Sequence, residues 1–377
     1  MLMDYFDNYA AAYTPYKSGS WCYEDGCIYR GLALLHEATG EGRWFAHLER
    51  LVNAQVSTDG DLAGYTVEEF NIDHILSGRA LIYLYKATGD EKYKAGAYLL
   101  ARQLALHPRT RSGVYWHKKV YPWQIWLDGL YMGLPFQIEF ARLSGDDALL
   151  DDALEQLVKA LSLTRESATG LYAHGYDESR QQQWADPDTG RSPAHWARAL
   201  GWLAMALVDI AELVGMGRMD ATGAGDHARR LLAQILALRT ADGTWLQVID
   251  RPDLPGNYAE SSATAMFAYA LLKAERIGFA EGFAAVGHGG LLALARRGLQ
   301  TDAKGRLRLA GICHVAGLGG FSNVYRDGTA NYYLTEPVVE DDAKGVGPLM
   351  MAKAESIRLG LDAPEHPAVP ATPPAHI

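Results

Sequence analysis

The sequence predicts an all-α protein with an (α/α)6 barrel fold, in which six inner helices are surrounded by six outer helices. One observation is a repeat: a glycine followed closely by an aromatic residue or a leucine occurs six times, as at Gly113 and Gly243, each time before a helical stretch. The other is that helices apolar on every side alternate with amphipathic helices. Such an alternation is typical of a buried inner ring inside a solvated outer ring.

The predicted inner helices are rich in small and apolar residues and begin with polar ones. They cover residues 24–38, 73–87, 126–143, 195–214, 260–277 and 341–359. Residues 197–210, for example, have the sequence ARALGWLAMALVDI and no polar face, which predicts burial on all sides. A linear solenoid is the alternative arrangement, but its inner helices would need an exposed concave face, which these helices lack.

Two amphipathic helices, predicted over residues 91–106 and 146–163, represent the outer ring. Helix ends are marked by Gly40, Gly89 and Gly145, because glycine is the preferred residue just past a helix C-terminus. An acidic residue follows each of these glycines, where it suits the positive N-terminal end of the next helix.

Residues 1–362 are interpreted as one barrel domain, and the Pro/Ala-rich residues 363–377 are predicted to be disordered. The net charge of -10 argues against a nucleic-acid or anionic-membrane partner, and no apolar run reaches the ~18 residues of a membrane span. The N-terminus lacks a basic stretch followed by an apolar run, so we expect a cytoplasmic protein, or a periplasmic one whose signal peptide has been removed. Monomer and homodimer both remain open.

The three cysteines, Cys22, Cys27 and Cys313, contain no CxxC pair, which predicts free buried thiols instead of a disulfide framework or a zinc ribbon. The sequence also lacks an HExxH motif, a P-loop and a dinucleotide-binding fingerprint. We therefore expect neither a metal nor an organic cofactor.

Polar residues cluster where the predicted inner helices begin, and a barrel would bring these starts together at one end. Among the carboxylates there, Asp73 and Asp128 are the catalytic candidates; either alone could be a helix N-cap, but both occupy the same position in their repeats. Tryptophans accompany them, which suits a sugar site because the apolar face of a sugar ring stacks on aromatic rings. They are Trp116, Trp123, Trp126, Trp184, Trp196 and Trp202.

These residues resemble those of the unsaturated rhamnogalacturonyl hydrolases, glycoside hydrolase family 105, and more distantly the unsaturated glucuronyl hydrolases of family 88. The resemblance extends over nearly the whole chain and is most specific at residues 126–135, WLDGLYMGLP. Other similar positions are Asp73, Lys118, His174 to Asp177, residues 192–202, and residues 324–333 with 342–347. One departure is Leu200, where the family usually has a small polar residue that could bind the sugar.

The resemblance implies hydrolysis that releases a 4,5-unsaturated galacturonic or glucuronic acid from the non-reducing end of an oligosaccharide. Protonation of C4 produces a cation at C5, which water traps, and the product opens to release the neighbouring sugar. Asp128 is the implied general acid and afterwards the base, because an apolar site favours a protonated carboxyl group; Asp73 would orient the water or help to hold that proton. The implied substrate-binding residues are Lys118, His174 and Arg198 for the carboxylate and hydroxyls, and Trp126, Trp196, Trp202, Met132 and Tyr23 around the ring.

Two other functions stay open at this point. One is an inverting glycosidase or a sugar epimerase on the same barrel; direct displacement would need two carboxylates ~6.5–9.5 Å apart. The other is a sugar-binding toroid without catalysis, which would bind its ligand without turnover.

Overall fold

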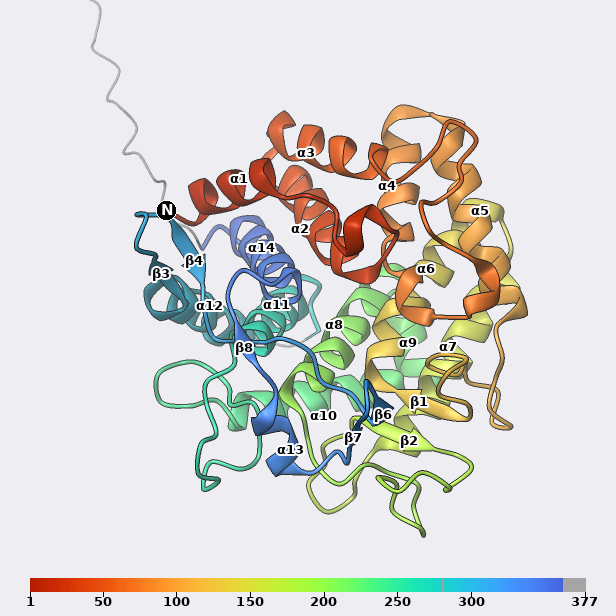
Figure 1. Ribbon diagram of the computed structural model, residues 1–377, viewed down its shortest axis with the longest axis vertical. Coiled ribbons are helices and arrows are strands. Elements are labelled where there is room, and N and C mark those ends of the chain that lie inside the picture. The colour runs from red at the N-terminus through yellow and green to blue at the C-terminus, as the bar shows by residue number, and fades with distance from the viewer. Residues whose placement is uncertain (280, 362–377) are drawn as a thin grey trace, which may run out of the picture.

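The computed structural model describes residues 1–279 and 281–361. Residue 362 and the predicted tail over residues 363–377 lie outside these described residues, so the disorder of the tail stays a prediction. Figure 1 shows the helices arranged around a common axis, with the N-terminal helix α1 close to the C-terminal helix α14. The (α/α)6 barrel is therefore confirmed.

Six helices of the described residues form the inner ring, each packed against the next. They are α2 (Tyr23–Thr39), α4 (Gly78–Thr88), α6 (Leu127–Ser144), α8 (Ala197–Val214), α11 (Ser261–Arg276) and α14 (Ala343–Arg358). Helix α14 in turn packs against α2 and closes the ring. As its lack of a polar face predicted, α8 is buried at every position from Ala197 to Ala211.

The outer ring covers the inner one and, within the described residues, contains six further helices. They are α1 (Leu2–Ala12), α3 (Gly42–Asn53), α5 (Glu91–Leu106), α7 (Asp147–Thr164), α10 (Ala224–Ala237) and α12 (Phe283–Ala293). The hydroxyl groups of Tyr5 and Tyr9 in α1 donate to the side chain and the carbonyl of Asp341, just before α14, at 2.6 and 3.0 Å. These hydrogen bonds tie the first helix of the described chain to the residue just before the last inner helix.

Shorter helices lie in the connections. They are α9 (Met216–Thr222), α13 (Ala330–Thr335), the 3-10 turns Lys17–Gly19 and Val67–Glu69, and the π-turn Leu294–Gly298. In the part of the chain described here, no single helix is both long and apolar enough to cross a membrane; α8 and α9 meet that test only jointly, across a bend of 117°.

The glycine stops predicted from the sequence are confirmed. Gly40, Gly89 and Gly145 directly follow α2, α4 and α6, with φ of 70°, 74° and 74°. Glycine adopts this left-handed conformation without a steric penalty, so each helix ends where the sequence indicated. All three cysteines are free and buried, as predicted.

One predicted helix start is wrong. Residues Ile72–Ile75 form a 3-10 turn, and α4 begins only at Gly78. Here i→i+3 bonds replace the α-helical ones, for example from the amide of Leu76 to the carbonyl of Asp73 at 3.2 Å. The side chain of Asn71 accepts the amide of Asp73 at 3.2 Å, so Asn71 is the cap and the Asp73 carboxylate is left for other contacts.

Four short antiparallel strand pairs within the described residues were not predicted, because two or three residues carry no detectable alternation. They are β1 (Gln124–Trp126) with β2 (Gly175–Asp177), β3 (Leu299–Thr301) with β4 (Leu307–Leu309), β5 (Ile312–Cys313) with β8 (Val338–Val339), and β6 (Gly319–Phe321) with β7 (Val324–Arg326). The β1–β2 ribbon positions the site, since it pairs Trp126 with Gly175, the residue after His174.

A buried charge network joins the inner helices deep in the barrel. Asp209 of α8 accepts hydrogen bonds from Arg79 Nη1 at 2.6 Å, from Lys273 Nζ at 2.7 Å, and from the hydroxyl of Tyr269. Burial alone would raise the pKa of Asp209, but Lys273 and Arg79 hold it well below its usual range. The carboxylate therefore stays charged and ties α4, α8 and α11 together.

Candidate active site

One end of the inner ring collects ionisable side chains, which come from the first turns of the inner helices and from the residues just before them. They are Glu24 of α2, Asp73 before α4, Asp128 of α6, Arg198 of α8, Glu260 before α11 and Lys344 of α14. We call this end, defined by these six residues, the mouth. The N-terminal ends of the inner helices add positive potential here, which favours an anionic ligand.

Asp73 is held in an ion pair at the mouth. Its Oδ2 lies 2.6 Å from Lys118 Nζ, and its Oδ1 lies 3.8 Å from His117 Nε2. Burial alone would raise the pKa of Asp73, but Lys118 and His117 lower it below its usual range. Burial would likewise lower the pKa of Lys118, and the attraction of Asp73 raises it instead. Both partners are therefore charged.

Asp128 lies in the first turn of α6 and faces His174. Its Oδ2 is 3.2 Å from His174 Nε2, while His174 Nδ1 lies 2.8 Å from the hydroxyl of Tyr333. The carbonyl of His174 accepts the amide of Leu127 at 3.0 Å, which ties the start of β2 to the start of α6. The Asp128 side chain keeps 15% of its surface exposed, so solvent reaches it, whereas His174 is fully buried.

His117 extends from Asp73 to the start of α6. Its Nδ1 lies 3.3 Å from the position that a Cβ would take at Gly129, next to Asp128, so the absence of a side chain there leaves room for the ring. Burial lowers the pKa of His117 to about 4, which keeps the ring neutral at pH 7. A neutral imidazole between two carboxylates can donate from only one of its nitrogens.

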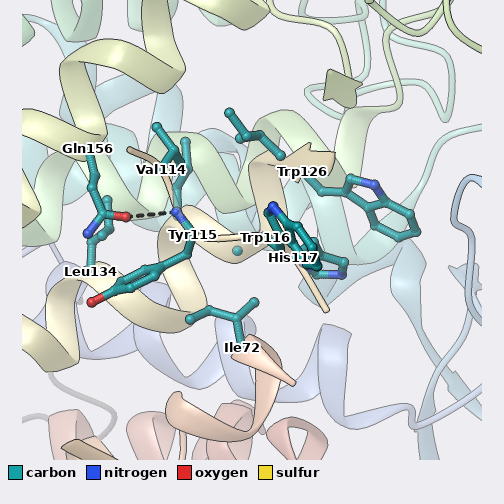
Figure 2. A pocket seen from close by; sticks show the side chains of 11 residues that line it. Ile72, Val114, Tyr115, Trp116, His117, Trp126, Leu134 and Gln156 are labelled. Atoms are coloured by element: carbon teal, nitrogen blue, oxygen red, sulfur yellow. Dashed lines mark hydrogen bonds between the residues drawn. The ribbon is translucent and has the colours of Figure 1, made fainter. Parts of the chain in front are cut away.

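An aromatic layer supports His117. The His117 and Tyr121 rings stack on the Trp126 indole, with centroids 4.3 and 4.8 Å away. The planes of the His117 and Tyr121 rings are nearly parallel, at 6°, and their centroids lie 6.3 Å apart. Figure 2 shows His117 beside Trp126, with Ile72 on the other side of a cavity of about 10 Å³. A cavity of this size admits one water at most, so it belongs to the wall and is no substrate site.

Arg198 is anchored by the backbone of the 312–314 segment. Its Nη2 donates to the carbonyl of Cys313, its Nη1 donates to that of His314 at 3.4 Å, and Glu260 Oε1 lies 3.6 Å away. The guanidinium also lies over the Trp196 ring, 5.3 Å from its centroid. These contacts engage both terminal nitrogens of the guanidinium, which leaves only part of the group for a substrate.

Several buried polar atoms around the mouth have no hydrogen-bond partner among the described residues. They are Asp73 Oδ1, His117 Nδ1, Asp128 Oδ2, His174 Nε2 and Arg198 Nε. Buried polar atoms are costly when unpaired, and native proteins pair most of them. Their concentration at the mouth indicates a place where the hydroxyls and carboxylate of a ligand complete the hydrogen bonds.

Two predicted sugar contacts, Trp202 and Met132, lie one helical turn deeper than the residues of the mouth. Trp202 lies one helical turn below Arg198 and stacks on Tyr131 at 5.3 Å, with 1% of its surface exposed. Met132 lies one turn below Asp128 and is also 1% exposed. Because residues four apart on a helix share one face, Trp202 and Met132 lie on the same faces as Arg198 and Asp128, one turn deeper in the barrel. A sugar contact by either residue stays a prediction.

The other predicted aromatic contacts differ in access. Trp126 and Trp196 are 4% and 2% exposed, and Trp196 stacks on Tyr333 at 5.7 Å and tilts against His174 at 4.9 Å. Neither ring is an open stacking platform; both support His174. Tyr23 is half-buried at the start of α2, between Lys17 and Lys344, whose amino groups lie 5.7 and 6.0 Å from its ring. A sugar contact by Tyr23 stays a prediction.

Sequence reasoning missed three residues of this site: His117, Tyr333 and Glu24. Each lies in a polar or aromatic segment recognised in the sequence, next to Lys118, at the end of residues 324–333, and next to Tyr23. Glu24 and His117 could have been found from their repeat positions near the starts of inner helices. The contact of Tyr333 with His174 could not, since α13 is inserted outside the six-hairpin pattern.

Comparison with known proteins agrees with this geometry. The sequence profile described as Glycosyl Hydrolase Family 88 matches residues 3–360. The chain belongs to glycosyl hydrolase family 88. The 24.9 kDa protein in the picA locus of Rhizobium radiobacter is 58% identical over 234 residues, which are 60% of this chain and 99% of that protein.

Two further relatives of this family 88 member are named as hydrolases. The unsaturated rhamnogalacturonyl hydrolase YesR of Bacillus subtilis is 27% identical over 265 residues, 68% of this chain and 72% of that protein. A solved structure of a family 105 glycoside hydrolase of C. acetobutylicum is 37% identical, with a TM-score of 0.85 over 89% of this chain and 93% of that chain. The family predicted from the sequence is confirmed, and the chain is a glycoside hydrolase.

Proposed function

We propose that this family 88 enzyme releases a 4,5-unsaturated uronic acid from the non-reducing end of oligosaccharides produced by polysaccharide lyases. Asp128 protonates C4 of the double bond, water adds at C5, and the resulting hemiketal opens to free the neighbouring sugar. Asp128, once deprotonated, then accepts the proton of that water, so one carboxyl group serves both steps.

One observation carries the proposal: Asp73 and Asp128, two of the four carboxylates of the mouth, are not equivalent. Asp73 is bound to Lys118 at 2.6 Å, whereas Asp128 Oδ2 accepts no hydrogen bond from the described residues. Direct displacement at the anomeric carbon needs two carboxyl groups with separate roles as acid and base. Among the described residues, Asp128 Oδ2 faces only the buried His174, at 3.2 Å, and no lysine or arginine, which suits the protonation and hydration of a double bond.

The remaining residues are assigned to positioning. His174 orients Asp128 and is itself oriented by Tyr333, which lies 2.8 Å from its Nδ1. The Asp73 carboxylate orients the water with its unpaired Oδ1, and Lys118 keeps that carboxylate charged. Lys118 and the free Nε of Arg198 attract the substrate carboxylate, together with the helix N-termini.

The decisive experiment is turnover of unsaturated disaccharides prepared by lyases from pectin, ulvan and glycosaminoglycans. The ultraviolet absorbance of the conjugated double bond should fall, and in D2O the product should carry deuterium at C4. Asp128→Asn should lower kcat by about 10² to 10⁴-fold while the protein stays folded, because it removes the proton donor. Asp147→Asn, on the exposed start of α7, is the matched control and should retain full activity.

Other outcomes separate the alternatives. Cleavage of saturated glycosides without deuterium at C4 would instead establish an inverting glycosidase. Tight binding of the disaccharides without turnover would establish a sugar-binding toroid. Unchanged activity of Asp128→Asn would contradict the assignment of the acid.

A further inference from the structure

A second pocket, of about 170 Å³, lies at the far end of the β1–β2 ribbon from the mouth. It is lined by Arg111, Trp123, Glu178, Ser179 and Gln181. At one end of the ribbon Trp126 pairs with Gly175, beside His174; at the other end Gln124 pairs with Asp177, and Trp123 and Glu178 are the next residues outward. The ribbon therefore connects the mouth to this pocket.

The backbone of Trp123 is held in an unusual conformation that places its ring in this pocket. Its φ is 65°, a left-handed conformation that costs a bulky residue about 1–3 kcal/mol. The amide of Glu178 donates to the Trp123 carbonyl at 3.0 Å, and the Trp116 ring tilts against the indole at 5.1 Å. Such strain is concentrated at ligand sites, and here it presents a half-buried indole to the pocket.

Arg111 supplies a positive charge beside this indole. Its guanidinium carbon lies 5.5 Å from the centroid of the Trp123 ring. The nearby Glu178 carboxylate accepts the backbone amides of Arg111 and Ser112 at 2.6 and 3.0 Å, and the described residues form no ion pair with the Arg111 side chain. The guanidinium therefore remains available for an anionic ligand, and an indole, a guanidinium and the exposed amide of Gln181 together suit a uronic acid.

We propose that this pocket is a distal subsite that binds an acidic sugar of the substrate, beyond the residue released at the mouth. This inference rests on the proposed function. Three residues of extended chain separate Trp123 from Trp126, a distance of at most about 10 Å, which a short oligosaccharide spans. The volume is below the ~300 Å³ typical of small-molecule sites, so the pocket accepts one sugar ring and not a longer segment.

The test compares di- and tetrasaccharides from one lyase digest of an acidic polysaccharide. Trp123→Ala and Arg111→Gln should raise KM for the tetrasaccharide about fivefold to tenfold, the effect of losing one ring or charge contact, and leave disaccharide turnover within about twofold. Trp123→Phe should restore most of the tetrasaccharide affinity. Tyr98→Ala removes an exposed aromatic residue of α5 and serves as the control, without effect on either substrate.

A binding experiment keeps the inference testable without turnover. Calorimetric titration with saturated tetragalacturonate should detect binding to the wild-type protein that weakens about fivefold to tenfold in Trp123→Ala and in Arg111→Gln. Equal losses for both substrate lengths, unchanged kinetics for both, or binding unaffected by either substitution would overturn the subsite. If no unsaturated substrate is turned over, the proposed function fails, and the titration alone decides the pocket.

Discussion

The Asp73–Lys118 pair provides the sharpest prediction. Lys118→Met removes the ammonium group and keeps a side chain of similar length, so Asp73 is left buried without its partner at 2.6 Å. The Coulomb attraction at this distance is about 6 kcal/mol for an effective dielectric constant of 20, and desolvation of each ion offsets several kcal/mol. Since Lys118 keeps 23% of its side chain exposed, we expect a net loss of about 2–3 kcal/mol in the free energy of unfolding at pH 7.

The pH dependence of this pair has a defined sign. Lys118 lowers the pKa of Asp73, so the pair stabilises the protein above the usual carboxyl pKa of about 4, and this contribution is lost as the pH falls below it. In Lys118→Met the effect of burial dominates and the pKa of Asp73 rises. The acidic limb of the pH profile of kcat/KM should therefore move to higher pH, because the proposed reaction needs Asp73 as a carboxylate.

Urea denaturation and pH–rate profiles measure both effects. Lys119→Met is the matched control. The amino group of the exposed Lys119 donates to the carbonyl of Glu68 at 3.4 Å and lies 5.7 Å from the Phe70 ring, and its removal should change stability by less than about 0.5 kcal/mol. The double variant Lys118→Met/Asp73→Asn should recover most of the lost stability, because no unpaired charge remains buried. Wild-type stability and an unshifted acidic limb in Lys118→Met would refute the reasoning.

Two further predictions concern the interior. Asp209→Ala should lower the free energy of unfolding by about 3–5 kcal/mol in urea titrations, because Arg79 and Lys273 lose their common partner. The control is Asp226→Ala, at an exposed position of α10, which should lower it by less than about 0.5 kcal/mol. Equal losses for the two variants would contradict this role of the network. Burial lowers the pKa of His107 and of His117 to about 4, so both rings are neutral in the folded protein at pH 7. The folded state is then most stable above about pH 6.5, the usual pKa of histidine, and loses stability as the pH falls toward 4. Unfolding measured at pH 7 and pH 5 should differ by about 2 kcal/mol for each histidine, and equal or greater stability at pH 5 would show that these rings are not buried in the neutral form.

Fold class could be predicted because it depends on local and periodic features. The inner helices are apolar on every side, and this property alone requires that they be surrounded. Gly40, Gly89 and Gly145 mark helix ends for a steric reason that belongs to each residue by itself. The repeat then predicts that Asp73 and Asp128 meet at one end, since helices of one ring that run in the same direction share the position of their N-termini.

The use of each side chain at the mouth depends on contacts between distant parts of the chain. Asp73 and Asp128 have the same repeat position, yet one is bound by Lys118 and the other faces His174. The sequence predicted Trp202 and Met132 as sugar contacts, and only the structure shows that both are buried one helical turn below Arg198 and Asp128.

By itself, the sequence determined the six-hairpin fold and the position of Asp73 and Asp128 at one end of the barrel. Only the tertiary structure decided that α1 is hydrogen-bonded to Asp341 at the start of α14, that Tyr333 supports His174, and that His117 stacks on Trp126. The physical reason is the range of the interactions: helix periodicity and capping act within a few residues. Which side chain stacks on an aromatic ring, or pairs with a charge, depends on residues from distant segments, which come together only after the six inner helices have closed into a barrel.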